Sequence, residues 1–283
     1  MTSASHPRSA DRNRPGPETG WVSVFGSGEP VTLFGHGFSG QIRDTRPFAA
    51  GIEGTRALVN LGGHGGRPSP GPGWDYGTIA SQLSQALTAA EAAAGAPVTR
   101  ALGVSMSAGG FARLLTSGDA AALALEKVAF VLPASWARFA AEQQAVIDAG
   151  VSQVCALLEA GDRAGLIAHF LAREPVEVQA LEPARAWAAQ KVDALLETDM
   201  SDGVGLAAQI AVADPATASA DAARFSGEVL VLTHEDDPSH PVQVAQEYAQ
   251  AFPRARLEVL PPGSILWRGR AEVRRILTEF FND

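Results

Sequence analysis

The stretch Arg100-Ala-Leu-Gly-Val-Ser-Met-Ser-Ala-Gly-Gly-Phe-Ala-Arg-Leu114 decides the fold of this chain. An apolar run ends at Val104, Ser105 follows, and a helical pattern begins directly afterwards. Small residues, Gly103 and Ser107, stand two positions before and two after the serine. This pattern is typical of a nucleophile elbow, a strained strand-to-helix turn that raises one hydroxyl above the sheet, where bulkier flanking residues would collide. The helix would also direct its N-terminal amides toward any group bound to that serine.

The elbow departs from the usual Gly-x-Ser-x-Gly spacing, because Ser107 occupies the last position. A second framing, Ser105-x-Ser107-x-Gly109, would make Ser107 the nucleophile. Ser105 is the better candidate, because it directly follows the strand whereas Ser107 would already lie in the helix. Small-residue turns of this kind also occur in α/β proteins without catalysis, so the rest of the chain must decide.

Composition narrows the class of protein. The chain has 283 residues, 46% hydrophobic and 19% charged, which fits a globular protein of one large domain or one domain with an insertion. Its net charge of -9 disfavours binding to nucleic acid or to an anionic membrane surface. No apolar run reaches the ~20 residues that a membrane span needs, and the N-terminus lacks a secretory apolar core. The lone Cys155 fits a core position, so we expect a cytoplasmic location; the oligomeric state is left open.

Strands and helices alternate along most of the chain. Residues 1–20 are rich in Ser, Arg, Pro and Gly and are predicted to be disordered. Two strands, 21–25 and 31–34, are expected to be joined by the turn at Gly26-Ser-Gly28. Further strands are expected at 57–61, 101–104, 128–132, 228–233 and 256–260, and helices at 74–94, 106–117, 241–252 and 271–281. This alternation predicts a mostly parallel, doubly wound α/β sheet.

The alternation stops between residues 134 and 225, where only helical patterns appear. A segment of this length is too long for a plain linker and indicates an all-helical cap over the active edge. The predicted organisation is therefore a core formed by 21–133 and 226–283, with the cap at 134–225.

Candidate partners for Ser105 follow other strands. Gly35-His-Gly-Phe-Ser-Gly40 could turn the Phe38 N–H toward Ser105, and Met106 N–H offers a second oxyanion donor. His36, in the same loop, is better interpreted as a brace than as a base. Asp237 follows the strand at 228–233 and is the candidate for the acid that orients the base, although acidic residues in loops often serve only as turn formers.

These motifs, in this order, resemble the α/β-hydrolase superfamily over about residues 21–281. The shared features are the glycine loops around His36 and His64, the Ser105 elbow, a helical insertion, and the loop from Asp237 to Pro241. The cap is similar to that of single-lid members such as esterases, C–C bond hydrolases and haloperoxidase-like proteins. The resemblance implies Ser105 as nucleophile, Asp237 as acid, and the Phe38 and Met106 amides as oxyanion donors.

The catalytic histidine of that family does not carry over. Its histidine usually lies in the loop after the last strand, where this chain has Leu260-Pro-Pro-Gly-Ser264, so Ser264 stands in its place. Serine cannot act as the base near neutral pH. The alternatives are His240, in the acid loop; His64, in a Gly-His-Gly turn; and His234, at the strand end. His240 has the best position, although it could simply cap the following helix or face solvent.

Three functions remain open on sequence alone. The first is serine-dependent hydrolysis of a small to medium apolar ester, thioester or related acyl compound, with Ser105, Asp237 and His240 as the catalytic residues. The second is a lyase, isomerase or cyclase that uses the same pocket without an acyl intermediate, and the third is a catalytically silent ligand-binding protein. No cofactor is expected, and no metal, because the histidines and aspartates of residues 234–240 lack a recognisable ligand spacing.

Overall fold

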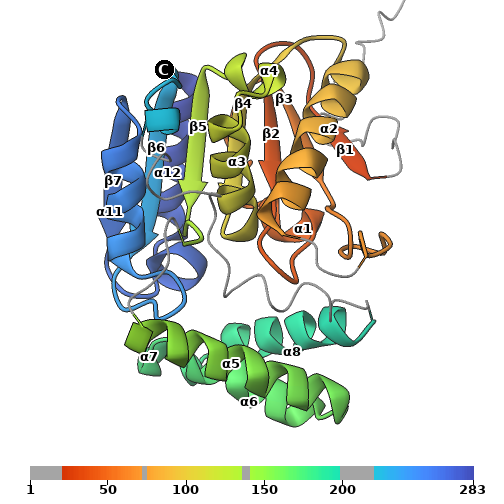
Figure 1. Ribbon diagram of the computed structural model, residues 1–283, viewed down its shortest axis with the longest axis vertical. Helices are drawn as coiled ribbons and strands as arrows, with labels where there is room; N and C mark the ends of the chain where they lie inside the picture. Colours follow the sequence, from red (N-terminus) through yellow and green to blue (C-terminus); the bar gives the residue numbers. More distant parts are fainter. Residues whose placement is uncertain (1–20, 72–74, 136–140, 198–219) are drawn as a thin grey trace, which may run out of the picture.

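The protein contains a seven-stranded sheet with helices on both faces and a helical insert (Figure 1). The computed structural model describes residues 21–71, 75–135, 141–197 and 220–283. The predicted disordered segment, residues 1–20, lies outside these ranges. The strand order is β1-β3-β2-β4-β5-β6-β7. Their bounds are β1 Val22–Phe25, β2 Val31–Gly35, β3 Thr55–Val59, β4 Val98–Val104, β5 Lys127–Val131, β6 Glu228–His234 and β7 Ala255–Leu260.

All neighbouring strands run parallel except β1, which pairs antiparallel with β3. The sequence prediction of a mostly parallel, doubly wound sheet is therefore confirmed. The turn at Gly26-Ser-Gly28 joins β1 to β2, yet these two strands do not pair, because β3 lies between them. Their sequences explain this difference. Strand β2 is buried on both faces and so belongs inside the sheet, whereas β1 alternates between buried and half-buried residues and fits an edge.

Two hydrophobic layers cover the two faces of the sheet. On one face, helices α2 (Tyr76–Ala94), α3 (Met106–Thr116) and α11 (Val242–Ala251) bury their apolar sides in a single cluster. On the other face, α12 (Arg270–Asn282) packs with the segment after α1 (Ile42–Thr45). The helices between the strands thus cover both faces of the sheet, and the carboxyl ends of the parallel strands lie at one edge.

The helical insert lies between β5 and β6 in the chain and across from the carboxyl edge of the sheet (Figure 1). A small apolar cluster around Val154, Leu166 and Val192 holds its helices together. Within the described residues, every helix is too short or too polar to cross a lipid bilayer. The helices of the insert are α5 (Ala141–Glu159), α6 (Arg163–Ala172), α7 (Val176–Gln179) and α8 (Glu182–Glu197).

The elbow depends on a close approach between β4 and the first turn of α3. A Cβ on Gly103 would lie 2.6 Å from the Ala108 nitrogen and 2.7 Å from the Ser107 carbonyl group. These are backbone atoms and cannot move aside as a flexible side chain could. The packing therefore requires glycine at position 103, on physical grounds independent of any chemistry at the serine.

We predict that Gly103→Ala lowers the free energy of unfolding by about 1–3 kcal/mol, as expected for overpacking against backbone. Gly150→Ala is the matched control, because the nearest atom to its added Cβ is the end of the Arg173 side chain, at 3.4 Å. Gly150 lies inside a helix, so alanine there should be neutral or stabilising. Urea unfolding curves measure both variants. Equal stability of Gly103→Ala and wild type would contradict the packing argument.

Candidate active site

Ser105 lies at the strained turn that joins β4 to α3. Its backbone has φ 49° and ψ -105°, a conformation that side-chain-bearing residues rarely adopt. The turn is held from both sides: Ser105 N–H donates to the Val131 carbonyl at 2.9 Å, and Gly109 N–H donates to the Ser105 carbonyl at 3.0 Å. The chain therefore holds the Ser105 hydroxyl above the end of the sheet, as the sequence pattern predicts for an elbow.

Ser107, the alternative nucleophile, is fully buried in the first turn of α3. Its hydroxyl donates to the carbonyl oxygen of His36 at 2.5 Å. A Cβ on Gly35 would lie 2.6 Å from both the Ser107 Cβ and its Oγ, so Gly35 makes room for this serine. Ser107 therefore ties the elbow to the loop after β2, and its geometry does not support the second framing of the motif.

The loop after β6 is folded by a carboxylate. Asp237 Oδ1 accepts the backbone N–H groups of Ser239 at 2.7 Å and His240 at 3.0 Å. This double acceptance turns the chain back toward the aspartate, as an Asx turn does. Pro238 lies within the turn, Pro241 follows it, and α11 begins at the next residue. As a result, the His240 side chain returns to the carboxylate that folds its own loop.

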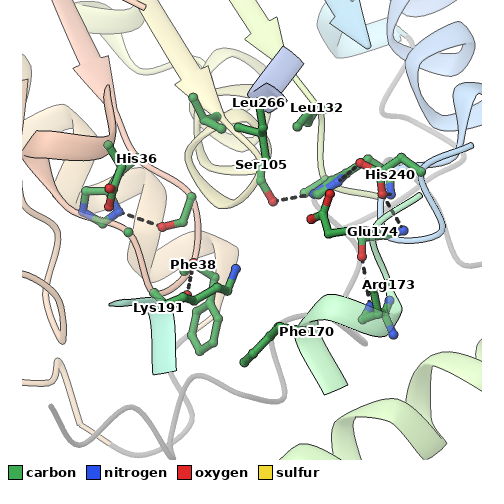
Figure 2. Close-up of a pocket in the computed structure, with 18 of the residues that line it drawn as sticks. His36, Phe38, Ser105, Leu132, Phe170, Arg173, Glu174, Lys191, His240 and Leu266 are labelled. Carbon is green, nitrogen blue, oxygen red and sulfur yellow. Dashed lines mark hydrogen bonds and ion pairs between the residues drawn. The ribbon is translucent and has the colours of Figure 1, made fainter. Parts of the chain in front are cut away.

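Ser105, His240 and Asp237 form one hydrogen-bonded chain, and Figure 2 shows its link between Ser105 and His240. The distance from Ser105 Oγ to His240 Nε2 is 2.8 Å, and that from His240 Nδ1 to Asp237 Oδ2 is 2.9 Å. The protonation that fits this arrangement places a proton on Nδ1, donated to Asp237, and leaves Nε2 free to accept the serine proton. The three side chains come from two loops at the same sheet edge.

The environment of Asp237 keeps its carboxylate ionised. Burial would by itself raise the pKa of Asp237, but several interactions lower it by more. These are the charge and hydrogen bond of His240, the charge of His234, and the Ser239 amide. The net pKa of Asp237 therefore lies well below its usual range. His234 is buried, with Nε2 3.6 Å from Asp237 Oδ2, and within the described part of the chain it makes no hydrogen bond to Ser105.

The glycine loop after β2 lies directly against Ser105. A Cβ on Gly37 would lie 3.4 Å from the Ser105 Cβ, so the backbone of this loop approaches the serine closely. A turn closed by the Gly40 N–H and the Gly37 carbonyl, at 2.9 Å, follows, and Phe38 lies inside that turn. Among the described residues, the N–H groups of Phe38 and Met106 have no hydrogen-bond acceptor, which leaves both candidate oxyanion donors available.

Two buried histidines hold this loop in place. His36 Nε2 accepts the Leu61 N–H at 3.0 Å, and His64 Nε2 accepts the Ser39 N–H at 3.1 Å. Their Nδ1 atoms lie 2.8 Å from the carbonyl oxygens of Gly37 and Gly62, respectively. Both nitrogens of each ring therefore contact backbone groups. His36 and His64 are accordingly positioned as braces, and neither makes a hydrogen bond to Ser105.

Burial keeps both of these histidines neutral. It lowers the pKa of His36 to about 3, with a further lowering by His64 and an opposing effect of the Gly37 carbonyl. It lowers the pKa of His64 to about 4, opposed by the Gly62 carbonyl and assisted by Lys191. Each ring can therefore accept an amide proton at one nitrogen while it donates from the other. A protonated ring would lose the acceptor on which the loop depends.

Ser105 opens into a cavity of about 360 Å³ between the sheet edge and the helical insert. This size is at the small end of the range for small-molecule sites. Within the described residues, no group of three or more His, Cys, Asp or Glu side chains is placed to hold a metal ion. The apolar part of the lining consists of Phe38, Phe48, Val104, Leu132, Ala134, Val151, Val154, Phe170, Pro175, Trp187, Pro238, Pro241 and Leu266.

The segment after β7, where the family's histidine was expected, contacts the helical insert. It forms the π-helix η2 (Ser264–Arg268), which begins at Ser264. Trp267 Nε1 donates to Glu174 Oε2 at 2.8 Å, and the Trp267 ring meets that of Trp187 edge-on at 5.5 Å between centroids. Arg173 of the insert also donates to Ser239 Oγ of the acid loop, at 3.1 Å. These contacts attach the insert to both loops beside the cavity.

Sequence reasoning missed the polar residues that the insert contributes to the cavity. Arg173, Glu174 and Lys191 all line it, and Tyr76 does so from α2. No motif marks these residues: Lys191 and Tyr76 lie on helices, Arg173 and Glu174 lie in the turn between α6 and α7, and only the tertiary fold brings them to the cavity. One signal was present for Lys191, which is one of only two lysines in the chain.

Comparison with solved structures identifies the fold. An esterase from Exiguobacterium antarcticum superposes with a TM-score of 0.70 at 15% identity, covering 96% of this chain and 100% of the other. An α/β hydrolase from Sphaerobacter thermophilus gives 0.62 at 20%, covering 95% and 100%. An enol-lactonase from Burkholderia xenovorans gives 0.68 at 18%, covering 93% and 96%. No protein-family model and no curated protein matches the sequence. The chain has the α/β-hydrolase fold.

We predict that stability falls as the pH is lowered from about 6.5 toward 4. The folded pKa values of His36 and His64 lie below the ordinary value of 6.5, so the unfolded chain binds more protons in this interval. Their contribution is therefore present above pH 6.5 and is lost as the pH falls. His64→Gln, which cannot titrate, should be less stable at pH 7.5 and should show a weaker pH dependence.

Urea unfolding at pH 7.5, 6.0 and 4.5, for wild type and His64→Gln, measures both effects. The same loss of stability in the two proteins between pH 7.5 and 4.5 would contradict a bracing role for a neutral His64.

Proposed function

We propose that this protein is a serine hydrolase that cleaves a small to medium ester, thioester or related acyl compound. The hydrogen-bonded chain from Ser105 through His240 to Asp237 carries the proposal. It supplies a base for the elbow serine, although the segment after β7 contains no histidine. The similarity of fold to an esterase and an enol-lactonase is compatible with acyl transfer but does not assign it.

In the proposed reaction, His240 Nε2 takes the proton of Ser105 Oγ as the oxygen attacks the substrate carbonyl. The Asp237 carboxylate accepts a hydrogen bond from His240 Nδ1–H and stabilises the imidazolium that forms. The negative charge on the former carbonyl oxygen would be met by the N–H groups of Phe38 and Met106. His240 then returns the proton to the leaving group, and a water molecule, deprotonated by His240, releases the acyl group from Ser105.

With His240 as the base, the histidine comes from the loop after β6 and not from the segment after β7, but the proposed proton transfer is the same. The base needs only to bridge the serine and a carboxylate, and an Asp-x-x-His turn meets this requirement within four residues. Because Asp237 Oδ1 holds the turn while Oδ2 holds the ring, a single carboxylate fixes both the position and the tautomer of the histidine. The segment after β7 is thereby free to support the helical insert.

The cavity favours a compact substrate with an apolar acyl or leaving group. Aromatic and aliphatic side chains form much of its wall, and its volume of about 360 Å³ suits a molecule of modest size. We infer that the insert, residues 134–225, acts as a cap that excludes water from the reacting groups. The hydrogen bond between Arg173 of the cap and Ser239 of the acid loop would link the position of the cap to the position of His240.

We predict that the wild type hydrolyses 4-nitrophenyl acetate or butyrate and that Ser105→Ala and His240→Ala each lower kcat by roughly 10³-fold or more. Asp237→Asn should also lower kcat strongly, because the histidine loses its orienting charge. Ser81→Ala is the control for a serine change, since Ser81 is exposed on α2. Release of 4-nitrophenolate measures all five proteins.

Covalent labelling separates this proposal from the other classes of function. A fluorophosphonate should label Ser105 stoichiometrically with release of fluoride, and labelling should disappear in Ser105→Ala and slow sharply in His240→Ala. If the wild type is neither labelled nor faster than its Ser105→Ala variant on any short ester, the hydrolase proposal is wrong. Turnover without labelling would favour a lyase, isomerase or cyclase, and binding without turnover a silent ligand-binding protein.

A further inference from the structure

Lys191 is a cation in the cavity wall that the proposed acyl-transfer chemistry does not use. It lies on α8 of the helical insert and lines the same cavity as Ser105. Figure 2 shows its side chain in the cavity wall near Phe38 and Phe170, on the side of the cavity opposite His240. A lysine in a mainly apolar cavity is costly unless something compensates its charge. Its surroundings therefore indicate what the cavity binds.

Aromatic rings hold the Lys191 ammonium in place. Its Nζ lies 5.0 Å from the centre of the Phe170 ring and 5.1 Å from that of Trp187. Both rings belong to the insert and line the cavity. Contacts of this kind attract a cation without using its N–H donors. The ammonium is thus oriented by two rings while its hydrogen-bonding capacity remains available.

Among the described residues, no carboxylate lies within ion-pair distance of Lys191 Nζ. The nearby acids are already engaged: Glu174 accepts the Trp267 indole N–H, Asp44 accepts the Gln41 N–H, and Asp237 holds His240. Burial lowers the pKa of Lys191, these three carboxylates oppose the shift, and Arg173 adds to it. An anion bound against Nζ would offset the cost of burying the ammonium.

We propose that Lys191 binds a carboxylate group of the substrate, so that the favoured substrates are acyl compounds with a second, ionised carboxyl group. A half-ester of a short dicarboxylic acid has this form: its ester carbonyl would face Ser105 and its free carboxylate Lys191. A single ammonium suits a monoanionic carboxylate, whereas phosphate dianions are usually met by several donors. This inference rests on the proposed function, because it names the substrate class of the same site.

The test compares two esters that have the same shape and leaving group but differ in charge. The first is the mono-4-nitrophenyl ester of adipic acid, which carries a carboxylate at neutral pH. The second is 4-nitrophenyl 6-methylheptanoate, in which an isopropyl group replaces that carboxylate. Wild type should have a higher kcat/KM for the charged ester after subtraction of the uncatalysed rate. The charge-assisted contact should make Lys191→Met at least tenfold slower on the charged ester and change the neutral ester by less than twofold.

Lys191→Met keeps an unbranched side chain of similar length, so the variant isolates the charge. Lys191→Arg, which restores a cation, should recover part of the preference and serves as a second variant if Lys191→Met folds poorly. Arg163→Met is the matched control, because it removes a positive charge from the exposed face of the same insert, where Arg163 pairs with Asp193 at 2.7 Å. It should leave the preference between the two esters unchanged.

Binding to proteins with Ser105→Ala separates failure of this inference from failure of the proposed function. Titration calorimetry should show that adding Lys191→Met weakens binding of the charged ester at least tenfold and leaves binding of the neutral ester unchanged. If the neutral ester is hydrolysed but Lys191→Met alters both esters equally, the carboxylate site is wrong and the hydrolase proposal stands. If neither ester is hydrolysed but binding still depends on Lys191, the carboxylate site stands and the hydrolase proposal fails.

Discussion

The arrangement around Ser105 depends on the two oxygens of one carboxylate. Asp237 Oδ1 folds the loop after β6 by accepting two backbone N–H groups, and Oδ2 holds the ring of His240. A histidine three residues after an aspartate can contact both that carboxylate and Ser105 only if the chain between them turns back sharply, and the carboxylate makes that turn. Loss of this carboxylate would therefore disturb the position of the ring as well as its charge.

The segment after β7 has a different role from the one that family resemblance implies. Instead of a histidine, it provides Trp267, which donates to Glu174 and packs against Trp187. Both partners belong to the helical insert. The insert is thus attached to η2 on one side and, through Arg173 and Ser239, to the acid loop on the other. The loop after β7 therefore supports the cavity wall through these contacts.

The elbow illustrates how a local departure from a motif is compensated elsewhere. Ser107 replaces the usual glycine, and its side chain needs space and a hydrogen-bond partner inside the protein. Gly35 provides the space, and the His36 carbonyl accepts the hydroxyl. The same loop is braced by two histidine rings kept neutral by burial. Residues around Ser105 that could be mistaken for catalytic groups therefore hold the loop that lies against it.

The sequence alone was sufficient to predict the fold and to select Ser105, Asp237 and His240 as candidates, because these depend on local signals. For Ser105 the signal is an apolar run that ends at a small-residue turn. For the other two it is an acid and a histidine three residues apart after a strand. Only the tertiary structure shows that β3 lies between β1 and β2. The short turn between β1 and β2 would suit a hairpin, but β2 is buried on both faces and therefore takes a place inside the sheet. The distance between Ser105 and His240, which lie 135 positions apart, also required the fold. The same is true of Lys191, because no sequence motif predicts how the helices of the insert pack around it.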